Sequence, residues 1–237
     1  IYKKIEYITK SDIESLISNK VAEGKKIEYK LSLPGDRDDD KREFLADVSS
    51  FANATGGDIF YGLIEKDGCP TEAVGIACNS DKEIDRLRNI IINGLQPRLQ
   101  GFQIVAINGF KDGSVIILRI LQSWNSPHMI TYLNLSRFFT RNSNGKYQMD
   151  VSEIKSAFLR SESISEKIRY IKDGRLAKII AGEVPTRIIS DSCLVVHIIP
   201  LVSLNPEFSM QLENMLNYEL ILKPISGTSY GSRHNID

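Results

Sequence analysis

The chain has 237 residues, 42% of them hydrophobic and 25% charged, which is ordinary for a globular protein of one or two domains. Its 30 basic and 30 acidic side chains cancel, which excludes a uniformly basic polyanion-binding coat but not a local basic patch. The longest apolar run, 194–202, is broken by His197 and Pro200 and is shorter than the roughly 20 residues of a membrane span. No signal-peptide pattern is visible, so we expect a cytoplasmic protein.

The three cysteines, Cys69, Cys78 and Cys193, stand at no spacing typical of a metal site. We interpret them as small buried side chains in a reducing compartment.

Apolar periodicity predicts alternating helices and strands in the first third of the chain. Ser11 and Glu14 have the spacing of a capping box for the first helix. The next strand places Glu28 and Lys30 on one face, because side chains two residues apart point the same way. A helix with acids before its N-terminus, a double-glycine turn and a strand apolar on both faces follow. The predicted helix, strand, helix, interior strand and short return strand cover residues 11–24, 26–33, 40–55, 58–64 and 71–76.

The sequence of residues 80–141 favours strands that pair in an antiparallel way. Ser80 and Glu83 form a second capping-box pattern, and Asn108-Gly109 and Asp112-Gly113 supply hairpin turn chemistry. A helix begins at Asp150. The predicted helix, hairpin and strand before it cover residues 80–97, 102–123 and 129–141. The chain is therefore predicted to be α+β, with a mixed, partly antiparallel sheet flanked by helices.

A shift in composition suggests a domain boundary near Ser161. Residues 1–161 make the core in this interpretation. Residues 162–237 add a helix at 163–180, a buried strand at 193–202 and a loose tail, and we expect them to be an extension or the start of a second domain.

Three acids and a lysine are the candidate catalytic residues. Glu28 and Lys30 share a strand face, Glu23 lies just before that strand, and Glu65 closes the interior strand. Carboxylates are preferred ligands of Mg²⁺ and Mn²⁺, and such a metal could activate water while Lys30 stabilises developing negative charge. The alternative is a solvated strand edge with an ordinary salt bridge.

Basic residues suggest a nucleic-acid surface. Arg137, Phe139 and Arg141 alternate on one strand, so two arginines could contact phosphates while the ring stacks on a base. The alternative is that Phe139 packs in the core and both arginines are merely solvated. The full set of candidate nucleic-acid-binding residues is Lys25, Lys26, Lys30, Arg137, Phe139, Arg141 and Lys146.

Several segments together resemble one family. Glu23 followed by IEYK, then FANATGG, an apolar strand ending in Gly-x-x-acid, SPHMI and RFFTR resemble the Schlafen core, also called the AlbA-like DNA-binding domain. The resemblance covers roughly residues 11–158 and implies a mixed α/β core. Some members cut transfer RNA or other structured RNA with three acids and a divalent metal. For this chain the resemblance suggests such an activity in a regulatory role or in antiviral defence. Those acids would fall here on Glu23, Glu28 and Glu65, with Mg or Mn as the metal.

Three functional hypotheses follow. The first is a metal-dependent endoribonuclease, acting on tRNA or other RNA in a defence or regulatory role. The second is a non-catalytic DNA- or RNA-binding module of a larger protein. The third is an interaction or oligomerisation scaffold that uses the helix at 163–180, as a homo-oligomer or in a larger assembly. ATP binding is not favoured, because no GxxxxGK[ST] phosphate loop is present.

Overall fold

The computed structural model describes residues 3–183, 196 and 198–199. Contacts divide the chain into two units, Ile1–Ser161 and Glu162–Asp237. The first unit holds every described strand, three helices and the first turns of a fourth. The buried strand expected at 193–202 and the expected tail lie outside the described residues, apart from Val196, Ile198 and Ile199.

Helices and strands are mixed in the described part, which confirms the predicted α+β class. Its α-helices are α1 (Lys10–Ser18), α2 (Asp38–Asn53), α3 (Ser80–Gly94) and α4 (Val151–Ile180). Its short 3₁₀ turns are η1 (Ile5–Tyr7) and η2 (Tyr132–Asn134). Its strands are β1 (Ile27–Lys30), β2 (Gly57–Tyr61), β3 (Leu63–Lys66), β4 (Cys69–Ala73), β5 (Leu95–Gln96), β6 (Phe102–Phe110), β7 (Gly113–Ile120), β8 (Met129–Ile130), β9 (Arg137–Asn142) and β10 (Gly145–Gln148).

The central sheet has the strand order β1-β2-β7-β6. β1 and β2 run parallel and are joined through α2, whereas β7 is antiparallel to both of its neighbours. This mixture is the one that the sequence predicted. The antiparallel hairpin β6–β7 was predicted from its turn residues, and β1 lies at the edge of the sheet.

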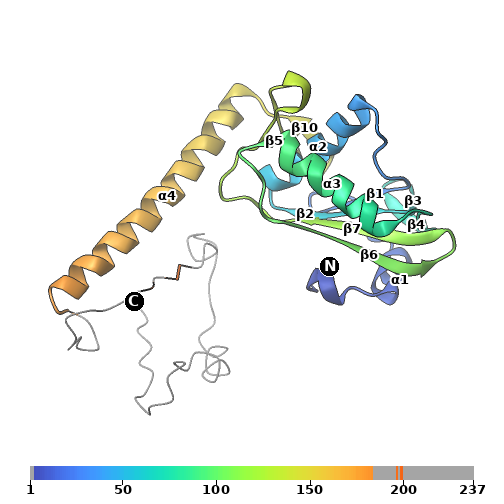
Figure 1. Ribbon diagram of the computed structural model, residues 1–237, viewed down its shortest axis with the longest axis horizontal. Coiled ribbons are helices and arrows are strands. Elements are labelled where there is room, and N and C mark those ends of the chain that lie inside the picture. The colour runs from blue at the N-terminus through green and yellow to red at the C-terminus, as the bar shows by residue number, and fades with distance from the viewer. Residues whose placement is uncertain (1–2, 184–195, 197, 200–237) are drawn as a thin grey trace, which may run out of the picture. The chain divides into compact units, whose positions relative to one another are not determined.

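Helices α2 and α3 lie on one side of the central sheet and α1 lies on the other (Figure 1), and a hydrophobic core fills each side. On one face, Phe51 of α2 and Leu87 of α3 are buried in the same cluster as Leu118 of β7. On the other face, Ile13 of α1 packs in a second cluster with Phe60 of β2. β2 is therefore buried on both sides, as its two-faced apolar pattern predicted.

Helix and strand ends differ from the prediction by a few residues. α1 is capped by Thr9 rather than Ser11, because the Thr9 backbone N–H donates to the Asp12 carboxylate at 2.7 Å. α3 is capped by Asn79 rather than Ser80. The predicted strand 58–64 is divided at Gly62, whose φ of +96° leaves the extended conformation. The predicted helix start at Asp150 is confirmed, since its carboxylate accepts from the Glu153 backbone N–H at 2.8 Å.

A second, smaller sheet has the strand order β10-β9-β8-β5. It is attached to α2 through Asn53, whose amide donates to the backbone carbonyls of His128 and Phe139 at 3.0 and 2.8 Å. The His128 N–H donates back to Asn53 at 2.7 Å. This sheet brings the candidate basic residues of β9 and β10 next to α2.

α4 is one helix where the sequence predicted two separate helical patterns. It runs without interruption from Val151 through the unit boundary to Ile180. No helix in the described part of the chain is both long enough and apolar enough to cross a membrane.

The first prediction concerns the double-glycine turn, Gly56-Gly57, between α2 and β2. A Cβ on Gly57 would lie 2.4 Å from Phe51 Cε1 and 2.5 Å from the Lys26 carbonyl oxygen. We expect Gly57→Ala to lower the free energy of unfolding by about 1 to 3 kcal/mol, because Phe51 of helix α2 and the backbone just before β1 must both move. Urea unfolding measures this.

The matched control is Gly24→Ala, because a Cβ on Gly24 meets nothing within 4 Å. Its stability should stay within about 0.5 kcal/mol of the parent chain. Equal losses in the two variants would contradict the packing described for the turn.

Candidate functional site

Glu28 and Lys30 of β1 point to the same side of the sheet edge, as predicted, and that side faces α2. The Lys30 ammonium lies 2.9 Å from Glu28 Oε1 and 3.0 Å from Asp47 Oδ2. Asp47 stands on α2, and only 1% of its surface is exposed. The site residue that the sequence analysis missed is therefore Asp47, the buried partner of Lys30.

Asp47 also pairs with Lys146 of β10, and Lys146 contacts Glu43 one helical turn earlier. Burial and the neighbouring Glu28 carboxylate raise the pKa of Asp47, while Lys146 and Lys30 oppose that shift. A buried carboxylate is tolerated here because two ammonium groups from different strands neutralise it.

Arg141 of β9 is a fully buried cation at this site, with 2% of its side chain exposed. Its Nη1 donates to Glu28 Oε2 at 2.8 Å, and its Nη2 donates to the Gly24 carbonyl at 3.1 Å. The guanidinium carbon lies 3.6 Å from the centre of the Phe51 ring, a cation–π contact. Arg141 therefore anchors β9 to β1 and α2 at the same time.

We call these five residues, Glu28, Lys30, Asp47, Arg141 and Lys146, the ion-pair network. Burial opposes ionisation of Glu28, but attraction to Lys30 and hydrogen bonds from Lys30 and Arg141 outweigh it and lower its pKa. Both carboxylate oxygens of Glu28 have a cationic partner.

Glu23 covers the open edge of β1. Its Oε1 accepts a hydrogen bond from the Tyr29 backbone N–H at 2.6 Å. Burial raises the pKa of Glu23, the Tyr29 hydrogen bond opposes this, and the carboxylates of Glu28 and Glu65 raise it further. Glu28 and Glu65 thus both lie close enough to Glu23 to raise its pKa.

Glu65, on β3, also accepts a hydrogen bond from the backbone. Its Oε2 accepts from the Gly68 backbone N–H at 2.8 Å and so closes the turn that follows the strand. Among residues 3–183, 196 and 198–199, no three His, Cys, Asp or Glu side chains form a group that could hold a metal ion. Both oxygens of Glu28 contact cations, whereas Glu23 and Glu65 each use one carboxylate oxygen on a backbone N–H. In this arrangement Glu28 would have to leave a cationic partner before it could bind Mg²⁺ or Mn²⁺.

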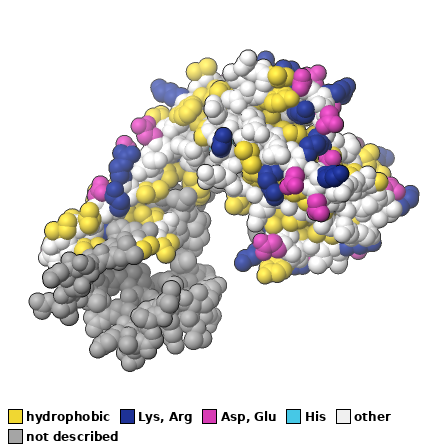
Figure 2. Space-filling model, in the orientation of Figure 1, with side chains coloured by type: hydrophobic (Ala, Val, Ile, Leu, Met, Phe, Trp, Pro, Cys, Tyr) yellow, Lys and Arg dark blue, Asp and Glu magenta, His cyan; other side chains and the backbone are white. Residues whose placement is uncertain are grey.

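The candidate basic residues fall into two groups. Lys30, Arg141 and Lys146 belong to the ion-pair network. Lys25, Lys26 and Arg137 are exposed. Phe139 is partly buried and packs against the hydrophobic cluster that contains Phe51 and Leu87, which is the alternative that the sequence left open. Lys, Arg, Asp and Glu side chains are interspersed on the face seen in Figure 2, without separation by sign.

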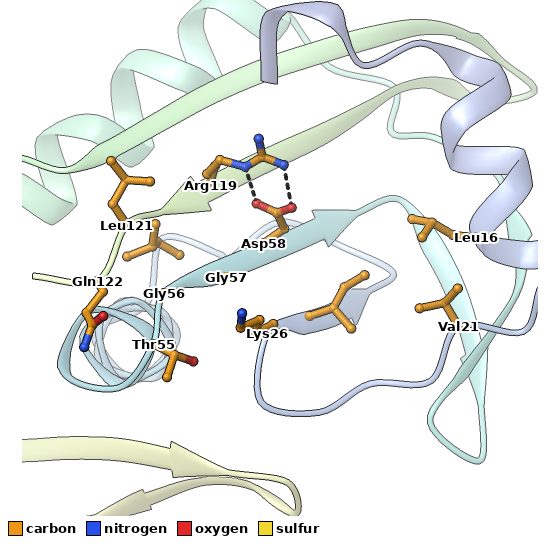
Figure 3. A pocket seen from close by; sticks show the side chains of 12 residues that line it. Leu16, Val21, Lys26, Thr55, Gly56, Gly57, Asp58, Arg119, Leu121 and Gln122 are labelled. Atoms are coloured by element: carbon orange, nitrogen blue, oxygen red, sulfur yellow. Dashed lines mark hydrogen bonds and ion pairs between the residues drawn. The ribbon is translucent and has the colours of Figure 1, made fainter. Parts of the chain in front are cut away.

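A groove of about 390 Å³ opens at the beginnings of β1 and β2 (Figure 3). Among its lining residues, Arg119 and Asp58 form a two-pronged ion pair, with Nε 2.7 Å from Oδ1. None of the three predicted acids lines it. The groove and the ion-pair network are thus separate features of the core.

The fold and the site define an α+β domain in which a parallel strand pair, its connecting helix and a small second sheet are held together by buried ion pairs. The family model for Schlafen, AlbA_2 matches residues 23–150, more than half of the 237 residues. The chain therefore belongs to the Schlafen AlbA_2 family, as the sequence motifs predicted. Among curated proteins no match was found.

Solved structures that this chain matches include the DIP2311 protein of Corynebacterium diphtheriae, at 17% identity and a TM-score of 0.42. That match covers 62% of this chain but 27% of the Corynebacterium chain. Another is the N-terminal domain of a RecG-related protein of Nitrosomonas europaea, at 19% identity and a TM-score of 0.41. It covers 58% of this chain and 92% of that domain. The family match, rather than these likenesses, carries the classification.

The ion-pair network gives the second prediction. Glu28→Gln should lower the free energy of unfolding at neutral pH by about 3 kcal/mol, because it leaves Arg141 buried beside a neutral group. A carboxylate with a lowered pKa stabilises the fold above its ordinary pKa of 4.5, and this contribution is lost as pH falls through the lower folded-state value.

The stability difference between the parent chain and Glu28→Gln should therefore shrink as the pH is lowered below 4.5. Urea unfolding between neutral and acidic pH measures it. A difference that stays constant over that range would show that Glu28 is not the stabilising carboxylate.

Proposed function

We propose that this chain is a nucleic-acid-binding module in which the acids around β1 serve the fold rather than cleavage. The observation that carries the proposal is the double ion pair of Glu28: one of its carboxylate oxygens contacts Lys30 and the other contacts Arg141. Withdrawing Glu28 would leave Arg141 as an uncompensated buried charge, which generally costs about 3 to 5 kcal/mol. Membership of the Schlafen AlbA_2 family supports nucleic acid as the ligand.

Phosphate contacts would come from cations that no acid neutralises. Lys25 and Lys26 precede β1 and Arg137 begins β9; all three are exposed. They have no salt bridge within the described part of the chain. Exposed lysines and arginines supply the sequence-independent part of nucleic-acid affinity. RNA and DNA are both candidate ligands.

The third prediction tests this proposal by fluorescence anisotropy with labelled tRNA, single-stranded RNA, single-stranded DNA and duplex DNA. We expect binding to at least one probe, with affinity that falls steeply as salt is raised. The triple variant Lys25→Gln, Lys26→Gln, Arg137→Gln should weaken binding by at least about tenfold at low salt, because up to three phosphate contacts are lost.

The matched control is Lys82→Gln, which removes an exposed cation on α3. It should bind like the parent chain. Absence of binding to all four probes, or binding that is insensitive to salt, contradicts the proposal.

A metal-dependent RNA or tRNA endonuclease is the second candidate. It is favoured by the proximity of the three acids, since Glu28 and Glu65 both raise the pKa of Glu23. In this alternative Glu28 would have to exchange Arg141 for the metal, so activity would require a rearrangement of β9.

The fourth prediction separates the two candidates. With Mg²⁺ or Mn²⁺ present, we expect the purified chain to leave tRNA and single-stranded RNA intact on denaturing gels. Cleavage that is lost in Glu28→Gln but kept in Glu72→Gln, an exposed acid of β4, would establish the endonuclease instead.

Self-association through α4 stays a prediction from the sequence. Tyr170 and Ile180 of this helix are 82% and 79% exposed, as a contact surface would require. Light scattering of the parent chain and of Tyr170→Ser, Ile180→Ser measures it.

A further inference from the structure

We propose that a polar pocket between β9 and the first turns of α4 is a binding site for a phosphate group of the nucleic acid. The inference rests on the proposed function, because it names the part of the ligand that this pocket holds. The pocket has a volume of about 350 Å³ and lies within the first unit of the chain. The lining residues that matter are Lys25, Thr55, Thr140, Arg141, Ser156 and Arg160.

Its charge favours an anion. Lys25 and Arg160 line the pocket, are exposed and form no salt bridge with the described residues. Glu153 is the one acid among the lining residues. Its carboxylate already accepts from the Asp150 backbone N–H at 2.9 Å and from the Tyr147 hydroxyl at 2.8 Å. Two cations without an acidic partner among the described residues thus line the pocket with a single carboxylate, so the charge of its lining favours an anion.

Two residues that line the pocket carry a buried polar atom with no hydrogen-bond partner among the described residues. Arg141 is almost fully buried and uses its Nη atoms on Glu28 and Gly24, but its Nε has no hydrogen-bond partner in the described residues. The buried Thr55 hydroxyl likewise has none there. Unsatisfied buried donors are uncommon in folded proteins, and a phosphate oxygen is a suitable acceptor for both kinds of group.

The remaining polar lining fits the same ligand. Thr140 and Ser156 contribute hydroxyls from β9 and from the exposed side of α4. Hydroxyls, together with lysine and arginine, are the usual partners of nucleic-acid phosphates. A metal ion would find one carboxylate here and several cations, so the chemistry selects an anion.

The pocket shares one residue with the ion-pair network. Arg141 belongs to both, and its Nη2 contacts the carbonyl of Gly24, the neighbour of Lys25. A phosphate in the pocket would therefore lie beside the acids of β1 and next to the exposed lysines that precede this strand. We infer that the nucleic-acid backbone passes along this side of the core.

The test measures two ligands with the full chain: a labelled single-stranded oligoribonucleotide by anisotropy and inorganic phosphate by NMR titration. Lys25→Gln and Arg160→Gln should each weaken oligonucleotide binding roughly tenfold at low salt and lower the salt slope by about 0.7. Lys111→Gln, which removes an exposed cation at the β6–β7 turn, is the matched control and should change neither.

Thr55→Val separates binding from folding. The substitution removes a buried hydroxyl without a partner and keeps the shape, so the melting temperature should stay equal or rise. Affinity for both ligands should nevertheless fall. A merely structural role for Thr55 would lower stability and leave affinity unchanged, which overturns its part in the site.

The outcomes also distinguish this inference from the proposed function. If the parent chain binds the oligonucleotide but Lys25→Gln, Arg160→Gln and Thr55→Val bind it equally well, the pocket is wrong and the proposed function stands. If it binds inorganic phosphate through these residues but no nucleic acid, the site takes free phosphate and the proposed function fails. Binding of neither ligand overturns both.

Discussion

The structure depends on the requirement that a buried charge be neutralised by a partner within reach. Asp47 is 1% exposed on α2 and is tolerated because Lys30 of β1 and Lys146 of β10 both contact its carboxylate. In the same way, Glu28 of β1 neutralises the buried guanidinium of Arg141 on β9. These pairs join the parallel βαβ unit to the second sheet, which hydrophobic contacts and Asn53 also attach to α2.

This constraint also determines which residues remain for function. Lys30, Arg141 and Lys146 form ion pairs with acids of the protein itself, and Glu28 pairs with two of them, Lys30 and Arg141. The cations whose charge has no acidic partner among the described residues lie outside the network, such as Lys25 and Arg160, and in the proposed pocket they act together with the Nε of Arg141. A chain of zero net charge can still bind a polyanion in this way, because steering depends on the local field.

Local signals in the sequence predicted most of the fold. The shared face of Glu28 and Lys30 followed from strand periodicity, and the hairpin β6–β7 followed from its turn residues. The network could not be predicted, because Arg141 and Glu28 are 113 residues apart and periodicity does not say which face is covered. Asp47 gave one signal: it lies three residues after Phe44 and four before Phe51, on the apolar face of its helix, where a lone acid requires a buried partner.

The central claim is that Glu28 is committed to Lys30 and Arg141 rather than to a metal ion. Titration of the full chain with Mn²⁺, followed by electron paramagnetic resonance at neutral pH, tests it most directly, with Glu28→Gln measured in parallel. The account predicts no stoichiometric Mn²⁺ site and identical titrations of the two proteins. One tightly bound Mn²⁺ per chain that disappears in Glu28→Gln would contradict it.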